Sequence, residues 1–240
     1  MRFYKFFISI FLIFTMCFYI TTPVFSEETT YVWSPNNNSL NASTNDNSSQ
    51  VKETNSEVDE SNSLSLESGS AILIEQTTGQ VLYSHNAHEQ LRPASVTKVM
   101  SILLIMEALD SNKISLTDSV PCSENAASMG GSQIWLDPRE TLTVDEMLKA
   151  ICVNSANDCV VAMSEFIAGS EEAFVQLMND KAKELGMNDT CFKNCHGLDE
   201  DGHVTSAYDI SLMSRELLNN HPSVTNYTTI WTDTLRNRKI

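Results

Sequence analysis

The sequence predicts an α/β (α+β) domain in which a β-hairpin precedes a helix-rich body. Two short apolar runs, SAILIE and QVLYS, flank QTTG, a pattern typical of a hairpin over residues 70–84. The run PASVTKVMSILLIMEAL at residues 93–109 is apolar on every side after its first turn, which predicts a buried helix. Apolar residues at helical spacing then fill most of the chain between residues 143 and 218.

Capping residues set the expected helix boundaries in this second half. Thr143 and Glu146 form a capping box before VDEMLKAICV. NSAN at residues 154–157 interrupts the helical spacing, and a further helix, DCVVAMSEFIA, follows it. Ser170 is the expected N-cap of EEAFVQLMNDKAKEL, and Gly186 is the expected stop.

Beyond that stop the sequence predicts one short strand and one more helix. TCFKN at residues 190–194 is the expected strand, and Ser206 and Asp209 cap the helix AYDISLMSRELL. A hairpin alone does not make a stable sheet, and the pattern shows no partner strands before Ile240. We therefore expect the sheet to be incomplete in this chain.

The first 66 residues are expected to lie outside the folded domain. Basic residues precede an uncharged run, FFISIFLIFTMCFYI, that is shorter than a membrane-spanning helix. This pattern predicts a secretory signal peptide over residues 1–26, with an uncleaved anchor as the alternative. Residues 27–66, rich in Asn, Ser, Thr and acids, predict a disordered linker. Residues 67–240 then form the globular domain.

The net charge and the cysteine content limit the classes of partner and ligand that the sequence predicts. The net charge of −16, with no block of Lys or Arg, argues against nucleic acid, and no basic amphipathic helix indicates a membrane surface. An odd number of cysteines follows the signal, so they cannot all pair internally, and we expect buried free thiols at Cys122, Cys152, Cys159, Cys191 and Cys195. A zinc site at Cys191, Cys195 and His196 is the alternative, but it lacks a second ligand pair, and we expect no metal or cofactor.

The candidate chemistry begins with Ser95 and Lys98, one turn apart at the start of the buried helix. Burial disfavours the charged form of a lysine, and a neutral amine beside a hydroxyl can accept its proton and create a nucleophile. The simpler explanation is a helix N-cap followed by a solvated lysine. The motif alone is weak, since Ser49 and Lys52 repeat it within the predicted linker.

A second pair lies between two predicted helices, where Ser155 and Asn157 form Ser-x-Asn. Cap chemistry alone could explain it, and residues 34–36 and 123–125 match the same tripeptide. However, Ser-x-x-Lys at a helix start, followed about sixty residues later by Ser-x-Asn, is a combination found in β-lactamases and penicillin-binding proteins.

Residues 70–240 resemble the serine D-alanyl-D-alanine carboxypeptidases, the low-molecular-mass penicillin-binding proteins. The resemblance includes ASVTKVM, SMGGSQIWLDPRETLTVDEMLKA, NSANDCVVAMSEFIAGSEEAFVQLMNDKAKELGM and NCHGLDEDGHVTSAYDI. It implies a β-lactamase/DD-peptidase-like fold, with helices on both faces of an antiparallel sheet beside an all-helical region. The implied site lies in the cleft between them.

The resemblance also implies roles for the residues. Ser95 would be the acylated nucleophile, its N–H contributing half of the oxyanion hole, and Lys98 would be the general base. Ser155 would relay a proton to the leaving nitrogen, and Asn157 would bind the substrate's peptide backbone. The implied substrate is a peptidoglycan stem peptide ending in D-Ala-D-Ala, and β-lactams would act as inhibitors at the outer face of the cytoplasmic membrane.

This sequence departs from the family pattern at its third motif. No Lys-Thr-Gly or Lys-Ser-Gly occurs in the 240 residues, although that motif supplies the carboxylate-binding strand and the second oxyanion donor in the family. We expect the motif to lie beyond Ile240, and we expect residues 1–240 alone to be neither stably folded nor active. Membrane association would then depend on segments outside this chain.

Two other functions stay open. A β-lactamase of the common class needs a general-base glutamate about three dozen residues after Ser-x-Asn, and MNDTCFKN in that region contains none. A non-catalytic module that binds peptidoglycan or β-lactams would explain the absent third motif. The four intact polar residues of the first two motifs argue against a decayed site.

Overall fold

The computed structural model describes residues 66–236 and 238–239. The predicted signal peptide at 1–26, and the predicted linker at 27–66 apart from Leu66, lie outside the described residues. None of the described helices is both long and apolar enough to cross a bilayer.

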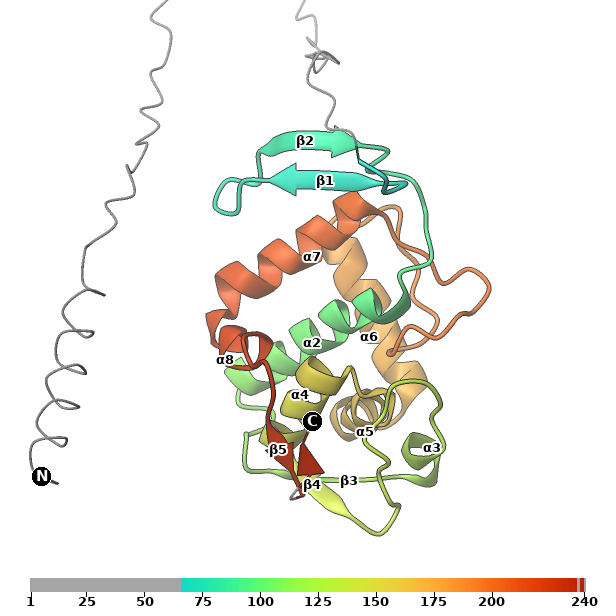
Figure 1. Cartoon of the computed structure of the whole chain (residues 1–240), viewed down its shortest axis with the longest axis vertical. Coiled ribbons are helices and arrows are strands. Elements are labelled where there is room, and N and C mark those ends of the chain that lie inside the picture. The colour runs from blue at the N-terminus through green and yellow to red at the C-terminus, as the bar shows by residue number, and fades with distance from the viewer. Residues whose placement is uncertain (1–65, 237, 240) are drawn as a thin grey trace, which may run out of the picture. The chain divides into compact units, whose positions relative to one another are not determined.

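The predicted hairpin is confirmed by strands β1, Ala71–Ile74, and β2, Val81–His85, which pair in antiparallel register (Figure 1). Gly79 makes the turn with φ of +77°, a left-handed conformation that glycine adopts without strain, and its N–H donates to the Glu75 carbonyl at 2.9 Å. Helix α7, Ala207–Asn220, packs against this small sheet.

The predicted buried helix is α2, Lys98–Asp110, which lies among the other helices (Figure 1). Met100, Leu103 and Ile105 have no exposed surface. The chain enters α2 through a 3₁₀ turn, Ala94–Thr97, so the serine of the first motif precedes the α-helix instead of opening it. Helix α7 packs against α2, as do two helices of the second half, α5, Asn157–Ala168, and α6, Glu171–Glu184.

The predicted helix boundaries in the second half are confirmed. Helix α4, Val144–Asn154, begins at the Thr143–Glu146 capping box. Helix α5, Asn157–Ala168, follows the NSAN break, and α6, Glu171–Glu184, begins at the Ser170 cap. Helix α7 begins at the Ser206 cap, which accepts the Asp209 N–H. Shorter helical segments are α3, Glu124–Ala127, a 3₁₀ turn at Pro222–Val224, and α8, Thr225–Thr228.

The predicted strand at residues 190–194 is wrong. Only Cys191 pairs there, in an isolated bridge with Val204, and the next N–H, from Phe192, donates to the Asn179 side chain instead of a neighbouring strand. Strand pairs that the sequence did not indicate are β3, Ser119–Pro121, with β4, Thr141–Thr143, and β5, Thr234–Leu235, with β6, Arg238–Lys239. All are two or three residues long, too short for a period-2 pattern to show.

The described part of the chain is thus a helical body with small two-stranded antiparallel sheets, which confirms the mixed class. The five described cysteines are free thiols, and Cys122, Cys159 and Cys195 are buried, as expected. Cys152 and Cys191 are half-buried. No three His, Cys, Asp or Glu side chains within residues 66–236 gather as metal ligands would.

Candidate active site

The first motif lies at a strained bend. Pro93 leads into Ala94, whose φ of +46° is left-handed and unfavourable for a residue with a Cβ. The 3₁₀ turn that follows contains Ser95, which is exposed, and Lys98 begins the α-helix behind it. In a 3₁₀ turn, residues i and i+3 eclipse, so the hydroxyl and the amine lie on one side. Strain of this kind is concentrated at functional sites.

The Lys98 amine is buried and lies between two oxygens. Its Nζ is 3.2 Å from Ser95 Oγ and 2.8 Å from the backbone carbonyl of His196. A carbonyl can only accept, so it always takes one N–H of the amine. The lone pair of a neutral amine then remains available for the hydroxyl proton of Ser95. This geometry suits a nucleophile with its general base.

Burial also favours the neutral amine. Desolvation lowers the pKa of Lys98 from its ordinary range to about 8. A Cys195 thiolate would oppose this shift, but burial raises the pKa of that thiol well above its ordinary value, so it stays protonated at neutral pH. A useful fraction of Lys98 is therefore an unprotonated base near neutrality.

The segment 194–198, NCHGL, encloses this pair, and the sequence did not assign it a role. Gly197 has φ of +93°, and a Cβ added there would lie 1.9 Å from the Ala94 carbonyl oxygen. The Gly197 N–H donates to Asn194 Oδ1 at 2.7 Å, and Ser101 Oγ of α2 donates to the Cys195 carbonyl at 2.6 Å. The family resemblance covered this segment without giving it a role, and its glycine is of the kind that can mark a close backbone approach.

The second motif lies at the α4–α5 junction. Ser155 ends α4 with φ of +54° and is half-buried, and its hydroxyl makes no recorded hydrogen bond in the described part of the chain. Asn157 is 3% exposed, and its Nδ2 donates to the Gly130 carbonyl at 2.7 Å. Its Oδ1 is buried without a partner. An unsatisfied buried acceptor is costly and calls for an explanation, which a ligand N–H would supply.

The two motifs share a neighbourhood without a direct hydrogen bond among the described residues. Helices α2 and α5 pack together. A Cβ added at Gly131 would lie 2.8 Å from Asn157 Nδ2 and 3.4 Å from Leu198 Cδ2. The NCHGL segment therefore contacts the Ser95 turn at Gly197 and the loop around Asn157 at Leu198. Both motifs contribute to one region, although the structure records no bond from Ser155 to Lys98.

Asp158, next to Asn157, is a supporting residue that sequence analysis missed. Its carboxylate accepts from the backbone N–H groups of Ile134 and Leu136 at 3.1 and 3.0 Å and is fully buried. It thereby fixes the loop whose Gly130 and Ser132 carbonyls hold Asn157. An acidic residue at the start of a helix was visible in the sequence, but its long-range partners were not.

The described second match to Ser-x-Asn, Ser123 and Asn125, is not part of the candidate site. Ser123 is the N-cap of α3 and accepts the Ala126 N–H at 2.9 Å, while the Asn125 amide donates to Glu165. This pair is cap chemistry. The matches at residues 34–36 and at Ser49 and Lys52 lie outside the described residues.

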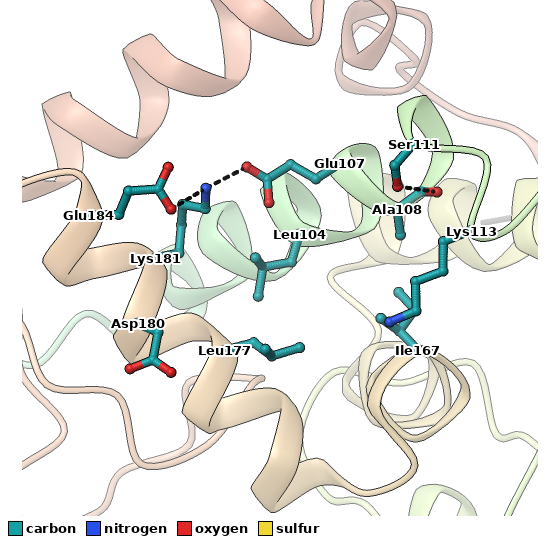
Figure 2. A pocket seen from close by; sticks show the side chains of 10 residues that line it. All are labelled: Leu104, Glu107, Ala108, Ser111, Lys113, Ile167, Leu177, Asp180, Lys181 and Glu184. Atoms are coloured by element: carbon teal, nitrogen blue, oxygen red, sulfur yellow. Dashed lines mark hydrogen bonds and ion pairs between the residues drawn. The ribbon is translucent and has the colours of Figure 1, made fainter.

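A cavity of about 470 Å³ lies elsewhere and does not suit the chemistry (Figure 2). It is lined by α2 from Leu104 onward, by α5 and by α6, whereas Ser95 precedes the first residue of α2. Lys181 is already paired at 2.8 Å with both Glu107 and Glu184. We place the candidate site at the Ser95 end of α2 because a reactive pair with a shifted lysine pKa is found there.

Comparison with known proteins decides the family. Residues 53–240 match the peptidase S11 family, described as D-alanyl-D-alanine carboxypeptidase. The chain belongs to this family. It is 58% identical over 170 residues to the D-alanyl-D-alanine carboxypeptidase DacF of Bacillus subtilis, covering 71% of this chain and 43% of that protein. It is 37% identical over 164 residues to DacC of Escherichia coli, covering 66% of this chain and 41% of that protein.

Solved structures agree with this assignment. Penicillin binding protein 6B from Escherichia coli superposes with a TM-score of 0.69 at 33% identity, over 72% of this chain and 56% of that chain. Penicillin-Binding Protein D2 from Listeria monocytogenes, in an ampicillin-bound form, gives 0.65 at 29% identity, over 74% and 72%. The peptidase S11 chain described here spans less than half the length of the curated relatives named above.

Proposed function

We propose that this peptidase S11 chain carries the nucleophile and the base of a serine D-Ala-D-Ala carboxypeptidase. Ser95 Oγ attacks the carbonyl carbon of the terminal D-Ala–D-Ala amide while Lys98 accepts its proton. The amide C–N bond breaks, the leaving D-alanine nitrogen is protonated, and an ester to Ser95 remains. Water then hydrolyses this ester. The 3.2 Å contact between Lys98 Nζ and Ser95 Oγ, with the lysine pKa lowered to about 8, carries this proposal.

The second motif completes the reaction scheme. Ser155 relays the proton from Lys98 to the leaving nitrogen, and its hydroxyl has no recorded partner in the described part of the chain. Asn157 binds the substrate's peptide backbone. Its unpartnered Oδ1 supports a role as acceptor of a substrate N–H. Ser95's own N–H serves as one oxyanion donor, a contribution worth roughly 10²–10³ in rate.

The substrate of this proposal is a peptidoglycan stem peptide that ends in D-Ala-D-Ala, and β-lactams are inhibitors that acylate the same serine. The ampicillin-bound structure of the Listeria protein supports the second part. In this proposal the protein acts at the cell wall outside the cytoplasm, and the signal peptide at 1–26 directs its export. Residues 27–66 act as the linker to the catalytic domain at 67–240.

The direct test is acylation by a fluorescent penicillin, followed by mass spectrometry of the labelled peptide. In a longer protein that includes the third motif, we expect the adduct on the peptide that contains Ser95, together with release of D-alanine from a peptide ending in D-Ala-D-Ala. An adduct on any other residue would refute the assignment of the nucleophile. Residues 1–240 alone should be assayed in parallel and are expected to show neither product, because the third motif supplies the second oxyanion donor in the family.

A non-catalytic module that binds peptidoglycan or β-lactams is the second candidate. The absence of Lys-Thr-Gly and Lys-Ser-Gly from the 240 residues favours it for this chain. The two candidates differ in their products. A binding module would retain a stem peptide without releasing D-alanine and would bind penicillin without a covalent adduct.

A further inference from the structure

Glu171, the first residue of α6, makes contacts that the proposed reaction does not use directly. Its Oε1 accepts the Cys195 N–H at 3.2 Å and the Cys195 thiol at 3.3 Å. It also lies 3.5 Å from His196 Nε2. One carboxylate oxygen from a distant helix therefore holds two consecutive residues of the NCHGL segment, 194–198.

The His196 ring is oriented toward this carboxylate. The Leu198 N–H donates to His196 Nδ1 at 3.1 Å, so Nδ1 is the acceptor nitrogen. In the neutral ring the proton is then on Nε2, which faces Glu171. Burial lowers the pKa of His196 and Lys98 lowers it further, while Glu171 and Glu200 oppose the shift, and the net direction is downward. The neutral ring is thus favoured near pH 7.

The carbonyl of the same residue, His196, is the acceptor that lies 2.8 Å from Lys98 Nζ. The segment also meets the Ala94 carbonyl at Gly197, one residue before the nucleophile. A shift of the 194–198 segment would therefore displace the Lys98 amine and would also move the turn that contains Ser95. Two side chains oppose such a shift, Ser101 from α2 through the Cys195 carbonyl and Glu171 from α6 through the Cys195 N–H.

We propose that Glu171 is a positioning residue for the Ser95–Lys98 pair, acting through the backbone of Cys195 and His196. This inference rests on the proposed function, because it assumes that Lys98 is the base. It assigns the effect to the position of one hydrogen-bond acceptor and not to the negative charge. A displacement of a catalytic group by about 1 Å can cost roughly 10²-fold in rate.

Variants of Glu171 separate acceptor position from charge. Glu171→Gln keeps an oxygen at the same reach and loses the charge, whereas Glu171→Asp keeps the charge and withdraws the oxygen by one methylene. We expect the rate of penicillin acylation to stay within about threefold of the parent for Gln and to fall roughly 10- to 100-fold for Asp. The affinity of the preceding non-covalent complex should change little, because Glu171 acts through the backbone of Cys195 and His196.

Glu172→Ala is the matched control. Glu172 is exposed, lies in the same first turn of α6, and has no recorded hydrogen bond to the 194–198 segment in the described part of the chain. Losing its charge should leave the acylation rate unchanged. Thermal melting of each variant identifies any that fail to fold. Because Gln has the same shape as Glu, a difference between the Gln and Asp variants reports the position of the acceptor oxygen.

A measurement without turnover separates this inference from the proposed function. NMR of the ¹³Cε resonance reports the Lys98 pKa in the whole chain, and Lys98→Arg assigns the signal. The titratable groups that face Lys98 are Cys195 and His196. We expect the Lys98 pKa to rise by about one unit in Glu171→Asp, because a loosened segment admits water, and to stay near the parent value in Glu171→Gln.

The outcomes are distinct. A parent protein that includes the third motif and is never acylated overturns the proposed function, and the NMR comparison still tests Glu171. Equal acylation rates and equal Lys98 pKa values in the parent and in Glu171→Asp overturn the positioning role. A Glu171→Gln variant as slow as Glu171→Asp also overturns it, because the charge and not the acceptor position would then matter.

Discussion

The two halves of the candidate site are built differently. The Ser95–Lys98 half is closed, because the amine has two oxygen partners and the NCHGL segment is tied to α2 and α6. The Ser155–Asn157 half is open only in its hydrogen bonding, because the Ser155 hydroxyl has no recorded partner among the described residues and Asn157 Oδ1, although buried, also lacks one. The protein thus satisfies its own groups on one side and leaves polar atoms free on the other.

This difference matches what each half must do. A general base needs a fixed position and a shifted pKa before the substrate arrives, and both come from buried partners. Groups that bind a peptide backbone must keep donors and acceptors available for it. We therefore expect changes in the closed half to affect chemistry and stability together, and a change at the Ser155 hydroxyl in the open half to affect chemistry alone.

The largest expected effect follows from removing the nucleophile. Ser95→Ala leaves Lys98 with no hydroxyl to activate, so penicillin should form no covalent adduct, as measured by intact-protein mass spectrometry. Ser49→Ala, in the other Ser-x-x-Lys match, is the control and should acylate like the parent. An adduct that persists in Ser95→Ala would place the nucleophile elsewhere.

Lys98→Arg should be nearly as damaging. Arginine keeps the positive charge but cannot lose its proton in a protein, so it cannot act as the base. General-base catalysis contributes typically 10²–10⁴ in rate, and we expect a loss of about that size in the acylation rate constant. Acylation within a few-fold of the parent would show that another group accepts the Ser95 proton.

The pH dependence should report the same base. Only the neutral amine is active, and the Lys98 pKa is about 8, so the acylation rate should rise with pH and level off above about 8. Below that pH, each unit of acidification should reduce the rate about tenfold. Stopped-flow measurements with one β-lactam would show this profile, and a flat profile between pH 6 and 8 would contradict it.

Local signals in the sequence predicted most of the fold. The turn around Gly79, the Thr143–Glu146 capping box and the Ser170 cap each act within a few residues, so they were visible in the sequence alone. The strand predicted at residues 190–194 failed because the backbone N–H and carbonyl of Phe192 pair with the side chain of Asn179 in α6. Such long-range partners leave no periodic trace.

For the candidate site, too, the sequence predicted the local contacts and missed the long-range ones. The spacing of Ser95 and Lys98 predicted their contact, since residues three apart share one side of a helical turn. Nothing local indicated that the His196 carbonyl would be the second partner of Lys98, or that Glu171 would hold that segment. The roles of Ser155 and Asn157 remain predictions.

A glycine pair tests how tightly the closed half is packed. Gly197 and Gly169 both have left-handed φ, of +93° and +87°, but only at Gly197 would a Cβ meet another atom, the Ala94 carbonyl. Gly169→Ala should cost about 1 kcal/mol of unfolding free energy from backbone strain alone. Gly197→Ala should cost about 2 kcal/mol more, because overpacking adds to that strain. Equal costs by urea denaturation would mean that the segment relaxes freely.

The smallest expected effect is a serine-to-alanine pair that compares the two halves directly. Ser101 and Ser155 lose the same hydroxyl, but Ser101 Oγ is fully buried and donates to the Cys195 carbonyl at 2.6 Å, whereas Ser155 Oγ has no recorded partner in the described part of the chain. Ser101→Ala leaves a buried carbonyl short of a donor and should cost about 1–3 kcal/mol. Ser155→Ala should change the unfolding free energy by less than about 0.5 kcal/mol and still slow acylation, because its proton relay is lost. A Ser155→Ala variant that is as destabilised as Ser101→Ala would mean that its hydroxyl has a structural partner and that the second half of the site is not open.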